Sequence, residues 1–178
     1  LYVGGGAIAS GATEELVELS NAMQIPVVTT LMGKGAFPAS HPMNLGPVGM
    51  HGSKFANLAM TESDLIIAAG ARFSDRVTGK LSEFAPHAKV IHIDIDPAEI
   101  GKIREAQVPI VGDLKGVVAG IVSTIEKEAC TPRTEAWNAQ IAEWRERYPF
   151  YDAQITENPN EIVPEIAMQK LSAKLDPH

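Results

Sequence analysis

Two arginines follow one of the most apolar runs of the chain. Arg72 and Arg76 lie in "GARFSDRVTG", which continues the run "DLIIAA". Arginine presents a planar fork that binds a phosphate or a carboxylate through two hydrogen bonds, and it stays charged when partly buried. The segment therefore predicts a local anion site. The alternative is an ion pair from Arg76 to Asp75 or Asp113.

A glycine-rich turn near the start of the chain could approach a diphosphate. Gly4, Gly6 and Ala9 match the dinucleotide fingerprint, in which glycines let backbone N–H groups reach the phosphates. That fingerprint also requires an acid about 20 residues later, at the end of the second strand. Here the second apolar run ends in Thr29 and Thr30. A standard NAD site is disfavoured, whereas a nucleotide held in another orientation is not.

Carboxylates follow a later apolar run, "KVIHIDID". In an extended strand His92, Asp94 and Asp96 alternate onto one face and the intervening isoleucines onto the other. A carboxylate at the end of this strand could accept hydrogen bonds from ribose hydroxyls. Two alternatives are a metal site, for which a further ligand is missing, and a helix N-cap at Asp96 before Pro97.

The segment 32–52 is rich in glycine, contains three prolines and has little helical or strand period. An irregular stretch of about 20 residues is unusual in a compact domain unless it has a function. His51 in this segment could lie against a flat ligand, or it could be an exposed loop histidine.

Apolar runs alternate with amphipathic stretches along the chain. Strands are predicted at residues 1–3, 25–30, 64–70, 89–96 and 108–112. Helices are predicted at residues 12–23, 53–61, 97–105 and 114–129, with Leu16, Leu19 and Met23 on one stripe of the first and Asp113 as a cap of the last.

This order of strands and helices predicts a doubly wound α/β fold with a parallel, Rossmann-like sheet, because apolar strands joined by helices need cover on both faces. Small or polar residues follow each of the five predicted strands. In such sheets ligands bind at the carboxyl ends of the strands, where the strand order reverses. We therefore expect a ligand site at that edge.

Composition excludes several classes of function. The chain has 178 residues and a net charge of −7, and its Lys and Arg are scattered, so no nucleic-acid or anionic-membrane footprint is present. The single cysteine, Cys130, excludes a disulfide framework and a cysteine-based zinc site. No apolar run is long enough to span a membrane. These features predict a soluble cytoplasmic protein.

The composition changes after Ala129. Residues 135–147 predict a charged helix with Trp137, Ile141 and Trp144 as packing anchors on one side, followed by a polar linker and the start of another helix. We divide the chain into a domain at residues 1–130, a helix and linker at 131–160, and the start of a further domain at 161–178. The chain reads as part of a longer polypeptide.

Several motifs in succession resemble one family. The segments "GGGA", "IPVVTTLMGKGAFP", "LGPVGMHG", "DLIIAAGARFSDRVTG", "HIDIDPAEI" and "VPIVGD" resemble the central domain of acetolactate synthase (acetohydroxyacid synthase) catalytic subunits. The resemblance runs over residues 1–129, and "NEIVPEIAMQKL" resembles the opening of the third domain of that family. These are thiamine diphosphate enzymes of three domains that also bind FAD.

The resemblance implies that this domain holds FAD in an extended pose across the strand ends. The implied cofactor contacts are Gly4, Gly5, Gly6, Thr30, Leu31 and Met32; Val48, Gly49, Met50 and His51 along the flavin; Gly70, Ala71, Arg72, Ser74, Arg76 and Val77 in the middle; and Asp94, Ile95, Gly112 and Asp113 at the adenosine end. Arg76 is also implied to hold the carboxylate of the second keto acid.

The resemblance further implies an activity. The family condenses pyruvate with pyruvate or 2-ketobutyrate, with loss of CO₂, in branched-chain amino acid biosynthesis, and FAD takes no redox part. Its glutamate that activates thiamine and its magnesium motif belong to other domains, so we expect no catalytic residue or metal ligand here and no activity of this chain alone. A homo-oligomer and a regulatory small subunit are the implied partners.

One position departs from the family pattern, and two alternatives stay open. The family often has a second aspartate where Ser74 stands, which leaves Asp75 as the only acid of that motif. The chain could instead be the central domain of another thiamine-dependent carboligase or oxidase, or a purely structural spacer between other domains.

Overall fold

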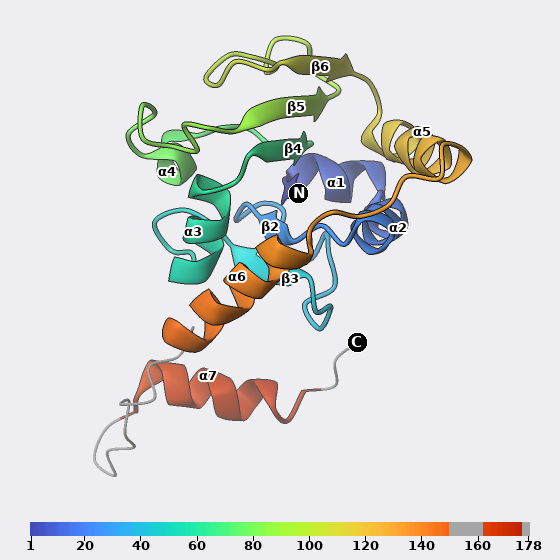
Figure 1. Cartoon of the computed structure of the whole chain (residues 1–178). Helices are drawn as coiled ribbons and strands as arrows, with labels where there is room; N and C mark the ends of the chain where they lie inside the picture. Colours follow the sequence, from blue (N-terminus) through green and yellow to red (C-terminus); the bar gives the residue numbers. More distant parts are fainter. Residues whose placement is uncertain (150–161, 176–178) are drawn as a thin grey trace.

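The computed structural model describes residues 1–149 and 162–175, and a parallel six-stranded sheet forms its centre (Figure 1). The strands are β1 (Tyr2–Val3), β2 (Val27–Thr29), β3 (Asn44–Pro47), β4 (Leu65–Ala69), β5 (Lys89–Asp94) and β6 (Val108–Val111). Their order is β3-β2-β1-β4-β5-β6, so the direction of winding reverses between β1 and β4. This is the order of a doubly wound dinucleotide-binding sheet, and the predicted fold class is confirmed.

Helices cover both faces of the sheet. They are α1 (Gly5–Ser10), α2 (Thr13–Met23), α3 (Lys54–Thr61), α4 (Asp75–Thr78), α5 (Leu114–Lys127), α6 (Glu135–Arg147) and α7 (Pro164–Ser172). In Figure 1, α1, α2 and α5 lie together on one side of the sheet, and α3 and α6 lie on the other. The central strands β1, β2 and β4 are therefore buried from both sides, which explains their apolar sequences, whereas β6 at the edge is largely exposed.

The two faces carry two separate hydrophobic clusters. Val3 and Ile93 pack with Leu16 and Leu19 of α2, as the helical stripe predicted, and with Val118 of α5. On the other face Tyr2 and Val90 pack with side chains of α3 and with two phenylalanines from the segments that follow β4, Phe73 and Phe84. Neighbouring residues such as Tyr2 and Val3 thus enter opposite clusters, because side chains alternate along a strand.

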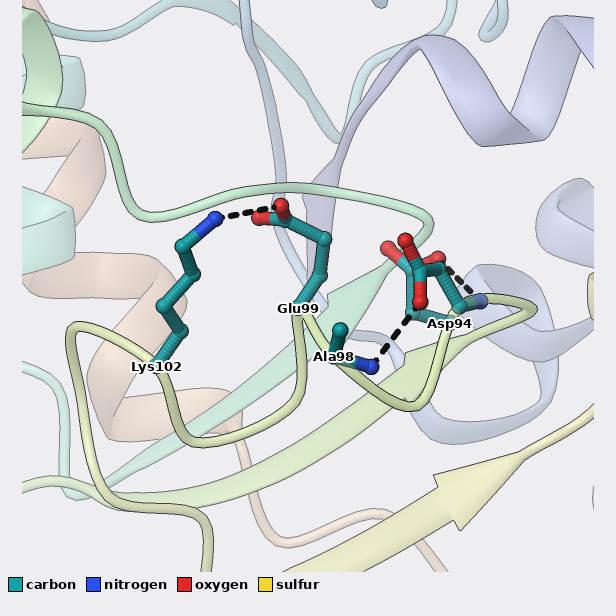
Figure 2. Close-up of polar contacts among 5 residues, drawn as sticks. Asp94, Ala98, Glu99 and Lys102 are labelled. Carbon is teal, nitrogen blue, oxygen red and sulfur yellow. Dashed lines mark hydrogen bonds and ion pairs between the residues drawn. The ribbon is translucent and has the colours of Figure 1, made fainter.

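The helix predicted at residues 97–105 does not form. Asp96 Oδ1 accepts a hydrogen bond from the N–H of Ala98 at 2.9 Å, which closes a turn instead of capping a helix. Gly101 then has a φ of +74°, a left-handed conformation that interrupts any right-handed helix. The segment is a series of turns in which Lys102 pairs with Glu99 at 2.8 Å (Figure 2).

The structure adds three short elements in places where no helix or strand was predicted. β3 lies inside the glycine-rich segment 32–52, at the edge of the sheet. Pro47 has no backbone N–H, which is tolerated in an edge strand because no further strand would accept a hydrogen bond from it. α1 and α4 each form one or two turns directly after β1 and the β4 segment. All three are too short to show a period in sequence.

The predicted helix over residues 135–147 is confirmed as α6, and its tryptophans pack as predicted. Ile141 is buried, and the rings of Trp137 and Trp144 meet edge to face with centroids 5.6 Å apart. Thr134 Oγ1 and Asn138 Nδ2 both donate to the carbonyl of Gln24 at the end of α2. The predicted polar linker, residues 152–160, lies outside the described residues. No helix in the described part is long and apolar enough to cross a membrane.

Candidate functional site

The residues that follow the strands form one continuous edge, as the sequence predicted. Backbone N–H groups just beyond the strands continue the parallel pairing, from Thr30 to Val3, from Val48 to Thr29, from Gly70 to Ile93 and from Gly112 to Asp94. These hydrogen bonds measure 2.9 to 3.0 Å. The loops therefore leave the sheet side by side, and the predicted site residues of all six strands lie along the same edge.

Glycines close the crevice where the strand order reverses. A Cβ on Gly4 would lie 2.2 Å from the carbonyl oxygen of Gly70, and one on Gly6 would lie 2.8 Å from the Gly70 Cα. The N–H groups of Gly4 and Gly6 donate to Ala69 and Gly70 carbonyls, both at 3.0 Å. The fingerprint predicted that these N–H groups would face a diphosphate. Here they instead join two turns, because only glycine lets the backbones approach so closely.

The turn after β2 packs on the same place. A Cβ on Gly33 would lie 2.4 Å from the carbonyl oxygen of Val3, and the Met32 Cβ lies 3.3 Å from the Cβ position of Gly5. Thr30 Oγ1 accepts from the N–H of Gly33 at 2.9 Å, which fixes the turn. With the crevice between β1 and β4 closed, a ligand at this edge must lie across the turns.

A buried aromatic group holds the segment that carries the two arginines. Tyr2 Oη donates to the carbonyl of Arg72 at 2.9 Å, and His92 Nε2 lies 3.0 Å from the carbonyl of Ala71. The ring of Phe73 packs against both, with centroids 5.5 Å from Tyr2 and 5.4 Å from His92. Side chains from β1 and β5, the two neighbours of β4, therefore fix the loop that follows β4.

The structure removes His92 from the ligand edge. The ring is 1% exposed, and its Nδ1 is a buried atom with no hydrogen-bond partner. A carbonyl only accepts hydrogen bonds, so Nε2 carries the proton, and burial lowers the pKa of His92, which keeps the ring neutral. His92 therefore supports the loop from below. In the described residues no group of three or more His, Cys, Asp or Glu side chains could hold a metal.

The arginines themselves project from the surface. Arg72 and Arg76 are both exposed, and none of the three ion pairs within residues 1–149 and 162–175 involves either of them. Asp75 accepts a hydrogen bond from the backbone N–H of Arg76 at 2.9 Å and not from its guanidinium. The alternative of an ion pair to Asp75 or Asp113 is not what the structure has, so both guanidinium groups remain available to an anion.

Large apolar side chains are exposed along the same edge. Leu31 and Met32 after β2 are each 73% exposed, and Met50 after β3 and Ile95 after β5 are each 72% exposed. Isolated exposed apolar residues need no explanation, but four of them after three strands of one edge indicate a surface that is covered by a ligand or by protein. His51, beside Met50, is exposed as well.

The two aspartates at the far end of the edge are used differently. Asp94 Oδ1 accepts from the N–H of Asp96 at 3.0 Å, which leaves Oδ2 for another donor (Figure 2). Asp113 Oδ1 accepts from the N–H of Gly116 at 3.2 Å and caps α5, as predicted. Ser74 and Val77 lie on either side of Arg76 at α4, and Ala71 is buried.

Two cavities lie at opposite ends of the strands. The larger, about 640 Å³, is mostly apolar and sits at the amino ends, between Leu1, Ile25, Leu65 and Trp137. None of the predicted site residues line it, and it lies at the opposite end of the strands from the edge where doubly wound sheets bind ligands. The smaller, about 290 Å³, lies at the carboxyl edge and is lined by Gly49, Asn57, Val77 and Thr78 among others. We take the carboxyl edge as the candidate site.

Sequence reasoning missed the residues that support this edge. The hydroxyl of Tyr2 and the side chain of Asn57, which bonds to Gly49, were not singled out. Asn57 is the one amide side chain in the otherwise apolar stretch "FANLAM", and a lone polar residue in such a helix is a signal that could have been used.

Known proteins are similar to this chain in sequence. Residues 1–121 match the family model described as the thiamine pyrophosphate enzyme central domain. The chain belongs to this family. It is 54% identical over 150 residues to the acetolactate synthase large subunit of Parasynechococcus marenigrum, covering 84% of this chain and 24% of that protein.

Two further relatives carry similar names. The chain is 49% identical over 173 residues to the acetolactate synthase large subunit of Cyanidium caldarium, covering 94% of this chain and 29% of that protein. It is 60% identical over 125 residues to the probable acetolactate synthase large subunit of Methanocaldococcus jannaschii, covering 70% of this chain and 21% of that protein. This member of the thiamine pyrophosphate enzyme family thus spans less than a third of these relatives.

Proposed function

We propose that this chain is the FAD-binding central domain of an acetolactate synthase large subunit. The observation that carries the proposal is the carboxyl edge of the sheet, which combines exposed apolar side chains after β2, β3 and β5 with two arginines after β4 that have no ion pair in the described residues. This combination of groups suits a flat ring joined to a diphosphate and a ribose.

The edge has the length for such a ligand. Six strands spaced about 4.8 Å apart give roughly 24 Å from β3 to β6. Because the glycine contact closes the crevice between β1 and β4, the cofactor lies across the turns in an extended pose. The residues present therefore fit FAD.

Each part of the edge suits one part of the cofactor. Val48, Gly49, Met50 and His51 supply apolar and aromatic surface for the flavin. Arg72 provides two parallel donors for the diphosphate, with backbone from Gly4 to Gly6, Thr30 to Met32, Gly70, Ala71, Ser74, Arg76 and Val77 around it. At the adenosine end Asp94 Oδ2 accepts from ribose hydroxyls, beside Ile95, Gly112 and Asp113.

The whole protein would condense two 2-keto acids with loss of CO₂. Thiamine diphosphate with Mg²⁺ would supply the carbanion chemistry when bound, at sites outside this chain, and FAD would take no redox part. Residues 1–130 would hold FAD, and the positively charged Arg76 would face the carboxylate of the second keto acid. A homo-oligomer in the cytoplasm with a regulatory subunit completes the proposal.

FAD titration of the protein tests the cofactor assignment. We expect quenching of flavin fluorescence and a rise in melting temperature, with weaker binding in Arg72→Ala. Arg133→Ala is the matched control, because Arg133 lies at the amino ends of the strands beside the larger cavity. If the chain does not bind FAD and the intact enzyme does, the pocket requires the other domains. If the intact enzyme binds no FAD, the assignment is wrong.

A further inference from the structure

One side chain outside the strand-end loops binds both backbone polar groups of a residue in one of them. Asn57 Oδ1 accepts from the N–H of Gly49 at 2.8 Å, and Asn57 Nδ2 donates to the Gly49 carbonyl at 3.0 Å. The side-chain amide thus satisfies both polar groups of one residue, as a neighbouring strand would do. Gly49 lies in the segment that follows β3, where no further strand supplies such partners.

The same glycine touches the arginine segment. Gly49 has a φ of +99°, and a Cβ there would lie 2.6 Å from the carbonyl oxygen of Arg76 and 3.3 Å from the Cα of Val77. The next residue, Met50, donates its N–H to the Arg76 carbonyl at 3.2 Å. The loop after β3 and the loop after β4 therefore meet, although β2 and β1 separate their strands in the sheet.

The helix that carries Asn57 is itself fixed. Ser53 caps α3 by accepting from the N–H of Ala56 at 3.1 Å, and Phe55, Ala56 and Met60 are buried in the core. The backbone of Asn57 donates to the carbonyl of Ser53 at 3.1 Å, within the first turn. The side chain of Asn57 therefore ties the loop of Gly49 to the fixed helix α3, and Gly49 in turn contacts the backbone of Arg76.

We propose that Asn57 is a positioning residue that holds residues 48–51 against the backbone of Arg76, so that the two loops present one preformed surface. The consequence for cofactor binding rests on the proposed function, whereas the coupling of the loops does not. Without the two hydrogen bonds from Asn57, the loop after β3 samples other conformations. The apparent affinity for FAD then falls in proportion to the fraction of molecules in which the loop keeps its binding conformation.

Three variants separate positioning from simple stability. Asn57→Ala removes both hydrogen bonds. Asn57→Asp keeps the acceptor for the Gly49 N–H but places a carboxylate oxygen where a donor met the Gly49 carbonyl. Ser63→Ala is the matched control, because Ser63 Oγ donates to the Met60 carbonyl at 2.9 Å at the opposite end of the same helix.

Amide hydrogen exchange measured by NMR on the protein tests the coupling directly. We expect the Gly49 and Met50 amides to exchange at least about tenfold faster in Asn57→Ala, with intermediate rates in Asn57→Asp, while amides in β4 and β5 keep their wild-type rates. Ser63→Ala should leave both loop amides unchanged. Unchanged exchange of Gly49 and Met50 in Asn57→Ala would overturn the proposal, as would uniformly faster exchange throughout the sheet.

FAD titration of the same variants gives the second measurement. If the wild type binds FAD, Asn57→Ala should raise its Kd about tenfold, equivalent to about 1.4 kcal/mol, and Ser63→Ala should not. An equal Kd for the wild type and Asn57→Ala overturns the link to the cofactor. If the intact wild-type enzyme binds no FAD, the proposed function fails and the exchange rates alone decide the role of Asn57.

Discussion

Replacing Gly70 with alanine tests whether the contact between the β1 and β4 turns is as tight as it looks. The added Cβ would lie 2.8 Å from the Gly6 Cα, 3.0 Å from the Gly6 carbonyl carbon and 3.1 Å from the Ala7 nitrogen, all of which are backbone atoms. No side chain can move away to make room, so one of the two turns must shift. The substitution also places alanine at a φ of +57°.

The two costs can be separated by a control. Gly11 has nearly the same φ, +64°, but a Cβ there meets nothing within 4 Å. Left-handed backbone costs an alanine about 1–2 kcal/mol at both positions. Crowding against fixed backbone adds about 1–3 kcal/mol at Gly70 alone. For a chain of this size each kcal/mol lowers Tm by about 2–4 °C, so Gly70→Ala should melt roughly 2–12 °C below Gly11→Ala.

Circular dichroism during thermal and urea unfolding of both variants provides the measurement. FAD titration is the second readout, because a displaced turn would move Arg72 and Ala71 away from the proposed cofactor site. If Gly70→Ala and Gly11→Ala unfold at the same temperature, the two turns have room to adjust. In that case the crevice is not closed by glycine packing, and the inference that a ligand lies across the turns loses its basis.

Three other outcomes follow from the same geometry. Tyr2→Phe should cost about 1–2 kcal/mol of unfolding free energy, because the Arg72 carbonyl loses its donor, and it should weaken FAD binding; a fully wild-type denaturation curve would contradict this. Asp113→Ala should cost about 1 kcal/mol through loss of the α5 cap, which urea unfolding measures against Asp113→Asn as the conservative variant. His92 should make the protein less stable in acid. Its folded pKa is lowered by burial, so its contribution is complete above the ordinary value of about 6.5 and is lost as pH falls below it, while the unfolded chain takes up the proton. The contribution of His92 is the difference between the wild type and His92→Gln from pH 7 to 5, and parallel curves would refute it.

Local patterns predicted the elements that have a strong period and a defined end. The stripe of Leu16 and Leu19 predicted α2, and the cap Asp113 predicted the start of α5. The segment after Asp96 carried the same kind of signal but does not form a helix, because Gly101 adopts a left-handed φ and Asp96 closes a turn. A cap residue in the sequence predicts that the chain turns at that point, but it does not predict whether a helix follows the turn.

The order of the apolar runs, and the residues that follow each run, were enough to predict the doubly wound class and the edge where polar and glycine residues collect. The roles of those residues became visible only from their contacts in the folded chain. Gly4 and Gly6 donate their N–H groups to the turn after β4, and His92 supports the loop of Arg72 from below. Asn57 bonds to Gly49 in the loop after β3, and Met50 in that loop bonds to Arg76 in the loop after β4. These roles depend on contacts between residues far apart in the chain, and no local spacing encodes such contacts.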